Sequence, residues 1–215
     1  MKIGIIGSGV VAQVLGNGFL HHGHNVMLGT GNPSKLEEWK TKSENQGLVG
    51  SFTESAKYGE IIILAVTGTK SEEAIKKSGI ENLKGKTVID ATNPIDSSKH
   101  PVNGVINYFT SYNDSLMERL QKLAPEANFV KAFNSVGNAF MVNPKFPDGK
   151  PTMFICGNSD KAKAQVINIL DQFGWDYEDM GKVEASRAIE PLCMLWCIPG
   201  FIRNQWSHAF KLLRM

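Results

Sequence analysis

The sequence predicts an α/β fold, a doubly wound and mostly parallel sheet with helices on both faces and a small α/β lobe at its C-terminal end. Short apolar runs alternate with helical patterns from the first residues onward, which is the order of a sheet whose parallel strands are joined by helices. The runs 2–6 and 60–66 are almost wholly apolar, as expected for strands buried on both faces. A glycine-rich turn follows the first run directly. Together these features are typical of a Rossmann-type fold.

The individual elements are predicted from apolar periodicity and from turn signals. The predicted strands are residues 2–6, 25–30, 48–52, 60–66, 86–90, 128–133, 152–156 and 175–179. The predicted helices are residues 10–22, 36–45, 71–78, 114–124, 160–173, 184–196 and about 201–213, with a brief helical connection that begins at Thr53 or Ser55. Residues 95–111 show little periodicity, and we expect an irregular segment near the functional site.

The turn-rich segment 143–151 is the one boundary that the sequence offers between two units. It contains Pro144, Pro147, Gly149 and Pro151, a composition that interrupts both helices and strands. We therefore expect a dinucleotide-binding domain at residues 1–143 and a small lobe at residues 144–215 that packs on it.

Composition narrows the class of protein. Of the 215 residues, 42% are hydrophobic and 20% are charged, and the net charge is only +2, so no nucleic-acid-binding surface is indicated. No window reaches the roughly 18 consecutive apolar residues that span a bilayer, and no signal peptide is visible. Three cysteines do not form a disulfide framework. We expect a cytoplasmic protein with no membrane partner.

The turn after the first strand, Gly7-Ser8-Gly9-Val10-Val11-Ala12, has the spacing of a dinucleotide fingerprint. Gly7 permits the tight turn, Gly9 lets the backbone approach a pyrophosphate, and a small Ala12 lets the helix pack close to the sheet. The helix N-terminus would direct its amides at the phosphates. The alternative is an ordinary strand-to-helix turn.

The end of the second strand indicates NADP(H) rather than NAD(H). The segment Gly29-Thr30-Gly31-Asn32-Pro33-Ser34-Lys35 contains no acid before Glu37, whereas a site for NAD carries an acid there to hold the ribose hydroxyls. Thr30, Asn32 and Ser34 can donate hydrogen bonds to a 2′-phosphate, and Lys35 supplies positive charge. The alternative is that these are turn and cap residues.

Three further strand ends are predicted to meet at the same edge of the sheet. Those of the strands 60–66 and 86–90 are expected to line the nicotinamide through Ala65, Val66, Thr67, Thr92, Asn93 and Pro94. For Asp90 and Asn93, turn chemistry before a proline is the alternative. No metal site is predicted, because His21, His22 and His24 lie where a helix ends and no carboxylate or cysteine is nearby. Cys193 and Cys197 are expected to pack rather than pair, since an i, i+4 disulfide has the wrong geometry.

Five motifs together resemble a known family. They are Gly7-Ser-Gly-Val-Val-Ala12, Gly29-Thr-Gly-Asn-Pro33, Asp90-Ala-Thr-Asn-Pro94, Lys131-Ala-Phe-Asn134 and Glu190-Pro-Leu-Cys-Met-Leu-Trp196. In this order they resemble the NADPH-dependent coenzyme F-420 reductase family, which is itself similar to the NADPH domain of six-transmembrane metalloreductases. The resemblance implies an NADP-binding Rossmann domain, a flavin or deazaflavin stacked beside the nicotinamide, and a homodimer. Many relatives place arginine where this chain has Gly31, which predicts weaker discrimination for NADP.

The expected activity is hydride transfer between NADP(H) and a flavin-like or deazaflavin acceptor. Such a reaction asks little acid–base chemistry of the protein, and no catalytic side chain is predicted. Asn134, Ser135, Leu192 and Trp196 would face the acceptor, with core packing as the alternative for Trp196. A non-catalytic NADP(H) sensor is the second hypothesis. A 3-hydroxyacid dehydrogenase is third, because residues 134–143 lack the lysine base that such enzymes use.

Overall fold

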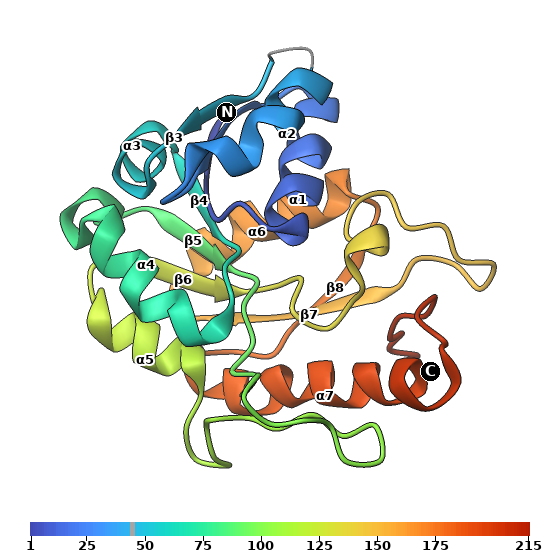
Figure 1. The fold of residues 1–215 in the computed structure, drawn as a ribbon. Helices are drawn as coiled ribbons and strands as arrows, with labels where there is room; N and C mark the ends of the chain where they lie inside the picture. Colours follow the sequence, from blue (N-terminus) through green and yellow to red (C-terminus); the bar gives the residue numbers. More distant parts are fainter. Residues whose placement is uncertain (44–45) are drawn as a thin grey trace.

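The computed structural model describes residues 1–43 and 46–215, and its strands form one sheet in the order β3-β2-β1-β4-β5-β6-β7-β8 (Figure 1). The strands are β1 Lys2–Ile6, β2 Asn25–Gly29, β3 Leu48–Gly50, β4 Ile61–Leu64, β5 Thr87–Asp90, β6 Asn128–Lys131, β7 Thr152–Gly157 and β8 Asp176–Asp179. The first six are parallel in the Rossmann order 3-2-1-4-5-6. β7 pairs antiparallel with β6 and parallel with β8. The predicted fold class is confirmed.

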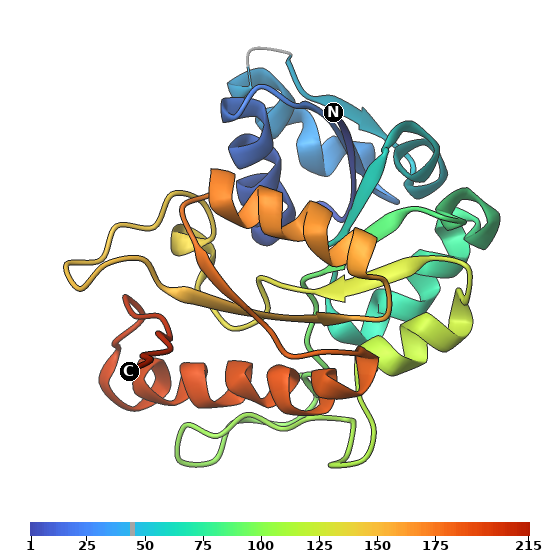
Figure 2. The same cartoon turned by 180° about the vertical axis from the view of Figure 1, so that it is seen from behind.

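Two hydrophobic cores lie on opposite faces of the sheet, and the alternation of side chains along each strand separates them. Ile61 and Ile63 of β4 belong to one core, and Ile62 and Leu64 belong to the other. The first core is covered by α1 Val10–His21, α2 Glu37–Lys42 and α6 Asp160–Gln172. The second is covered by α3 Phe52–Tyr58, α4 Ser71–Ser78, α5 Leu116–Leu123 and the start of α7 Ser186–Arg203 (Figure 2). This arrangement makes the sheet doubly wound.

The helix predicted at 36–45 is shorter in the structure, and it follows a 3-10 turn. Pro33–Leu36 forms this turn and α2 continues as Glu37–Lys42. Residues 44 and 45 of the prediction lie outside the described residues. α3 begins earlier than predicted, because Ser51 and Glu54 form a capping box. The spacing Ser-x-x-Glu is a sequence signal for this start.

The predicted helix at 201–213 is wrong, as is the predicted helix end at Trp196. Pro199 does not terminate α7, which continues to Arg203 and ends at Asn204 with a left-handed φ of 52°. The chain then reverses, and the Trp206 ring packs so close to Gly200 that a Cβ there would lie 2.2 Å from it. Residues 204–215 therefore run back without helical structure (Figure 1).

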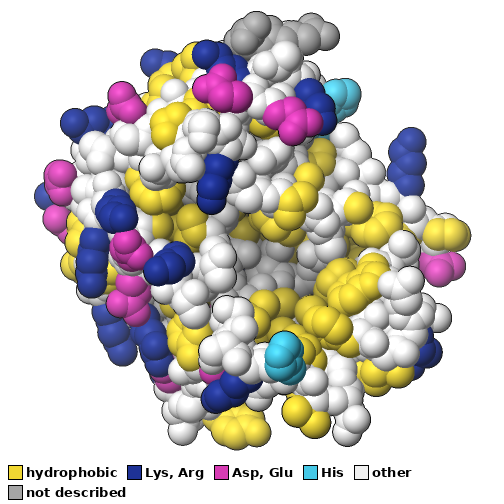
Figure 3. Space-filling view, in the orientation of Figure 1, with side chains coloured by type: hydrophobic (Ala, Val, Ile, Leu, Met, Phe, Trp, Pro, Cys, Tyr) yellow, Lys and Arg dark blue, Asp and Glu magenta, His cyan; other side chains and the backbone are white. Residues whose placement is uncertain are grey.

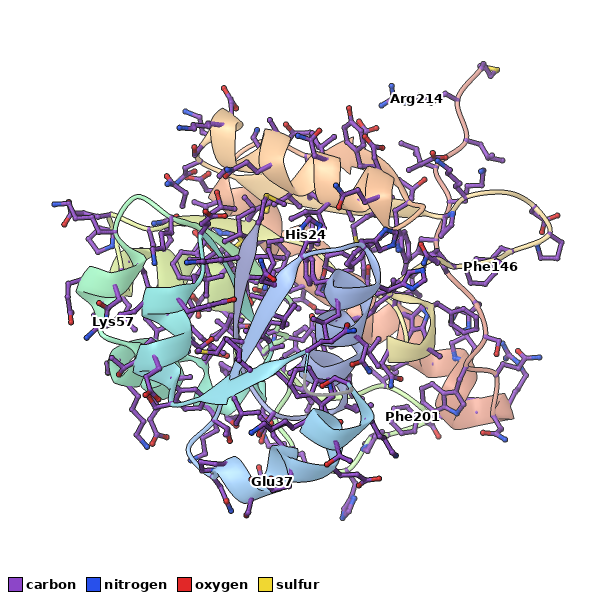
Figure 4. All side chains as sticks on the ribbon, turned by 90° about the horizontal axis from the view of Figure 1, so that it is seen from above. His24, Glu37, Lys57, Phe146, Phe201 and Arg214 are labelled. Atoms are coloured by element: carbon purple, nitrogen blue, oxygen red, sulfur yellow. The ribbon has the colours of Figure 1, made fainter. Side chains whose placement is uncertain are left out.

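The reversed segment 204–215, the C-terminal tail, is held by α7 and by the start of β7. The Trp196 indole nitrogen donates to the carbonyl oxygen of His208 at 2.8 Å. The Thr152 amide donates to the carbonyl oxygen of Phe210, also at 2.8 Å. Figure 4 shows the tail running from the end of α7, near the labelled Phe201, toward Arg214. These contacts with distant residues replace the local hydrogen bonds of a helix.

The segment between the two predicted units is an irregular loop after the 3-10 turn Asn138–Phe140, as its prolines and glycine indicate. Beyond it, β7 and β8 join the sheet, and α6 packs in the same core as α1. The division at residue 143 remains a prediction. Among the helices of the described residues, none is long and apolar enough to cross a membrane.

Candidate nucleotide-binding edge of the sheet

The turn after β1 fits a dinucleotide pyrophosphate. Gly7 has a φ of +147°, and a Cβ there would lie 2.2 Å from the carbonyl oxygen of Ala65, so only glycine permits this close approach to the end of β4. A Cβ on Gly9 would meet no heavy atom within 4 Å. Gly9 is also the N-cap of α1, so no side chain caps the first amides of this helix. Exposed amides at a helix N-terminus bind anions.

A cavity of about 440 Å³ adjoins this turn and brings together several predicted residues. Ser8, Thr30, Gly31, Asn32, Lys35 and Val66 line it. Within the turn, the Asn32 amide donates to the Thr30 hydroxyl at 3.1 Å, and the Ser34 hydroxyl donates to the Asn32 side chain at 2.6 Å. These bonds stabilise the turn itself, as expected if Thr30, Asn32 and Ser34 are turn and cap residues. Lys35 adds an ammonium group to the cavity wall.

Sequence reasoning missed the opposite wall of this cavity, which α4 and its preceding residue provide. Lys70 and Lys77 line it together with Glu73. The Lys77 ammonium lies 2.7 Å from Glu73, whose pKa it lowers, and Lys70 lies 3.6 Å from the same carboxylate. Three lysines thus face one acid. The seven-residue spacing of Lys70 and Lys77, two helical turns, is the sequence signal that places both on one side.

At the ends of β5 and β6, the side-chain amides of Asn93 and Asn134 form a reciprocal pair. The Asn93 amide donates to the backbone oxygen of Asn134 at 2.7 Å, and the Asn134 amide donates to the Asn93 side-chain oxygen at 3.1 Å. The Oδ1 atom of Asn134 is buried and has no hydrogen-bond partner. Buried polar atoms are nearly always paired, so this acceptor is suited to a donor that a ligand or a small rearrangement would bring.

The neighbouring predicted residues differ in how far they are exposed at this edge. Thr67 is exposed, Val66 is half-buried, and Ala65 and Ser135 are buried. Thr92 and Pro94 are buried as well, and the Thr92 hydroxyl donates to Asp90 at 2.6 Å. This hydrogen bond between Thr92 and Asp90 is typical of a turn before a proline, which was the alternative expected for this segment.

An unusual backbone conformation precedes the amide pair. Phe133 has a φ of +61°, a left-handed conformation that is rare for a bulky side chain. Its ring is buried, and its backbone amide donates to the Met153 sulfur at 3.1 Å. Strained residues of this kind often lie at functional sites. This turn sets the direction in which residues 134–137 leave β6.

Below the amide pair lies a buried ion network that sequence reasoning also missed. The Lys131 ammonium lies 2.6 Å from Asp90 and 2.9 Å from Glu190, and the side chains of all three are at most 2% exposed. Burial lowers the pKa of Lys131, but the neighbouring carboxylates of Asp90 and Glu190 raise it by a larger amount. The net shift of the pKa is upward, and the ammonium stays charged. The Glu190 carboxylate also accepts the amides of Leu116 and Met117, each at 3.0 Å.

On α7, Leu192 is half-buried and Trp196 is buried. The Trp196 ring stacks on His208 at 4.9 Å between centroids and lies 5.6 Å from Trp206. A Cβ on Gly137 would lie 3.0 Å from the same ring. Trp196 is therefore packed in the interior, which was the alternative to its facing the acceptor. Its ring lies against the segment that leaves β6. In Figure 3 the molecule is hollowed near the centre of this face, and hydrophobic side chains gather at the rim.

The histidines that follow α1, for which no metal site is predicted, form hydrogen bonds with different residues. His22 is hydrogen-bonded to Asn143 at 3.2 Å, and His24 to Gln172 at 2.9 Å. Within residues 1–43 and 46–215, no group of three or more His, Cys, Asp or Glu side chains could hold a metal ion. Cys156, Cys193 and Cys197 are free thiols.

Comparison with known proteins agrees with this geometry. Residues 2–94 match the family described as NADP oxidoreductase, coenzyme F420-dependent. The predicted family resemblance is thereby confirmed, and the similar proteins are named as NADP-dependent oxidoreductases, in agreement with the predicted enzyme class.

Individual relatives extend the similarity over nearly the whole chain. The F420-dependent NADP reductase of Methanocaldococcus jannaschii is 28% identical over 209 residues, which cover 91% of this chain and 90% of that protein. Metalloreductase STEAP3 of Rattus norvegicus is 28% identical over 212 residues, 94% of this chain but 39% of that protein. The chain thus spans about two fifths of the metalloreductases it matches. A crystal structure of an F420-dependent NADP-reductase candidate from Arthrobacter sp. FB24 superposes with a TM-score of 0.93 at 29% identity, with full coverage of both chains.

Proposed function

We propose that this chain transfers hydride between NADP(H) and a flat flavin-like or deazaflavin acceptor of the coenzyme F-420 type. The observation that carries the proposal is the order of three features along neighbouring strands. The lysine-lined cavity adjoins β2, the glycine turn follows β1, and the Asn93–Asn134 amide pair lies after β5 and β6. An adenosine phosphate, a pyrophosphate and a nicotinamide follow one another in the same order in a bound dinucleotide.

In this proposal the residues bind and orient, and NADP(H) supplies the hydride. The 2′-phosphate lies among Lys35, Lys70 and Lys77, which outnumber the one acid, Glu73, that faces them. The pyrophosphate lies on Gly9 and on the free amides at the start of α1. Hydride transfer then depends on holding two rings face to face at short distance and on excluding water.

Around the nicotinamide we place Ala65, Val66 and Thr67 after β4 and the Asn93–Asn134 pair opposite them. A Cβ on Gly68 would lie 1.9 Å from the carbonyl oxygen of Asn93, so the ends of β4 and β5 meet directly at this place. The acceptor would then approach from the side of Ser135 and α7, where Leu192 is half-buried. Trp196 would support this side from behind.

The proposal includes a homodimer and a reducing cytoplasm. Leu195, Phe201 and Ile202 of α7 are each at least half exposed, and apolar side chains gathered on one element are typical of an interface with another chain. The three free thiols are usual for a reducing compartment.

The decisive experiment follows NADPH oxidation by the loss of its near-ultraviolet absorbance. The purified chain is mixed with NADPH and, in separate reactions, with a deazaflavin, FMN, a ferric chelate or a quinone. We expect turnover with the deazaflavin or the flavin, and faster turnover with NADPH than with NADH. Tight NADPH binding without turnover on any acceptor would instead support the sensor hypothesis.

A further inference from the structure

We propose that Lys131 and Glu190 are positioning residues that fix the Asn93–Asn134 amide pair at the cofactor edge. The inference rests on the proposed function, because that function gives the amide pair its ligand. The two residues lie on different elements, β6 and α7, and are 59 positions apart in the chain. Their buried ion network connects to the amide pair by two separate routes.

The first route runs from Lys131 to Asn93 through the backbone. The third hydrogen bond of the Lys131 ammonium goes to the carbonyl oxygen of Thr92 at 3.0 Å. This carbonyl belongs to the peptide group that precedes Asn93. Asp90 holds the other side of the same turn, since its Oδ1 accepts the Thr92 amide at 2.9 Å. The turn that carries Asn93 is thus held from both sides by one ion pair.

The second route runs from Glu190 to Asn134. The Asn134 side-chain amide donates to the carbonyl oxygen of Ile189 at 3.0 Å, and Ile189 precedes Glu190 on α7. The Glu190 carboxylate fixes this part of α7 to β6 through Lys131 and to the first amides of α5 through Leu116 and Met117. The position of the Ile189 carbonyl therefore depends on the Glu190 carboxylate.

Orientation explains this network better than stability does. Removing two carboxylates and an ammonium from water costs free energy, and apolar replacements of similar volume are often as stable. The network instead gives each ammonium hydrogen a separate acceptor, at Asp90, Glu190 and Thr92. Such a set allows one arrangement of β5, β6 and α7, and a fixed arrangement is what hydride transfer requires.

The test compares Glu190→Gln with the matched control Glu118→Gln. The glutamine in Glu190→Gln keeps the shape of the side chain but loses the charge that faces Lys131. Glu118 also joins α5 to α7, through an ion pair with Arg187 at 2.6 Å, and its hydrogen bonds go to Ser115 and Arg187 rather than to Asn93 or Asn134. Both variants should lose some thermal stability. Glu190→Asp, which keeps the charge and shortens its reach, is the second variant if Glu190→Gln does not fold.

Two readouts separate positioning from simple stabilisation. In the protein without cofactor, the side-chain amide NMR signals of Asn93 and Asn134 should have chemical shifts that differ from those of exposed asparagines. This difference should be lost in Glu190→Gln and kept in Glu118→Gln. In the assay with flavin or deazaflavin, kcat should fall about tenfold or more in Glu190→Gln only, while the Kd for NADPH changes less than about twofold in both. Glu190→Asp should show intermediate losses.

Unchanged amide signals in Glu190→Gln, or an equal loss of kcat in Glu118→Gln, would overturn the inference. Failure of the proposed function looks different. In that case the unmutated protein reduces none of the acceptors, whereas the amide signals of the variants still decide whether Lys131 and Glu190 hold the pair.

Discussion

Gly31 differs from Gly7 in what surrounds its missing side chain, and this difference bears on cofactor choice. A Cβ on Gly7 would strike the backbone of Ala65, directly after β4, whereas a Cβ on Gly31 would meet no heavy atom within 4 Å. Gly31 is exposed and lines the cavity that contains Lys35, Lys70 and Lys77. In the proposed site, lysines as point charges therefore contact the 2′-phosphate, without the planar fork of an arginine.

Gly31→Arg should strengthen NADPH binding and leave NADH binding nearly unchanged. The position has room for the side chain, and a guanidinium can form paired hydrogen bonds with a phosphate. We expect the ratio of the two Kd values, measured by fluorescence titration, to rise roughly threefold to tenfold, about 0.7–1.4 kcal/mol. Gly31→Ala is the matched control and should leave the ratio unchanged. Equal affinities for NADPH and NADH in the unmutated protein would contradict the NADP assignment.

At the scale of single residues, the sequence predicts sites whose residues lie close together along the chain. The glycine turn and the residues from Thr30 to Lys35 are found in this way, and the structure brings Ser8 of the turn and four of the six residues from Thr30 to Lys35 to one cavity. It does not predict contacts between distant positions. Lys131 is 41 residues from Asp90 and 59 from Glu190, and only the folded sheet and α7 bring these charges together. Each of them looks like an ordinary polar residue in its own segment.

Among the elements, prediction succeeds where apolar periodicity decides and fails where packing overrides a local rule. The fully apolar run Ile61–Leu64 is a central strand, and the helix Ser71–Ser78 has the predicted bounds. Proline and glycine at 199 and 200 predict a helix end, yet α7 continues to Arg203. Gly200 is used differently here, because its missing side chain makes room for the Trp206 ring. No local pattern signals that contact.

Removing the C-terminal tail should expose Trp196 and lower the melting temperature. A chain ending at Arg203 loses Trp206, His208 and the bond between Thr152 and Phe210, which together cover the ring and the start of β7. Exposing a large apolar side chain costs about 1.5–3 kcal/mol, which corresponds to roughly 3–12 °C for a chain of this size. Tryptophan fluorescence should shift to the red, and iodide should quench it more strongly.

The control for this truncation is a chain ending at Leu212. It keeps Trp206, His208 and Phe210 and loses only the last three residues, of which Arg214 pairs with Glu178 at the surface. An exposed ion pair contributes at most about 1 kcal/mol, so this variant should melt close to the full chain. A chain ending at Arg203 that is as stable as the control would show that the tail does not cover Trp196 in solution.

At the scale of the whole molecule, the proposed cofactor would connect parts that are distant in the sequence. It would contact the ends of β1, β2, β4, β5 and β6, which carry residues from both sides of the sheet's central switch between β1 and β4. These strands also form the middle of both hydrophobic cores. A ligand held by all of them binds the folded chain and has no comparable site on the unfolded one, so binding and stability are linked.

NADP should therefore stabilise the chain against heat, and more strongly than NAD at equal concentration. A ligand present at one hundred times its Kd adds about 2.7 kcal/mol to the free energy of unfolding. For a domain of this size that corresponds to roughly 5–11 °C in melting temperature, which differential scanning fluorimetry measures directly. NAD lacks the 2′-phosphate that the lysines at 35, 70 and 77 would hold, so its shift at the same concentration should be smaller.

Lys77→Ala should reduce the NADP shift toward the NAD value. The control is Lys84→Ala, which removes a lysine paired with Glu126 outside the cavity and should leave both shifts unchanged. Equal shifts for the two cofactors in the unmutated chain would contradict the NADP assignment, because the 2′-phosphate would then add nothing to binding.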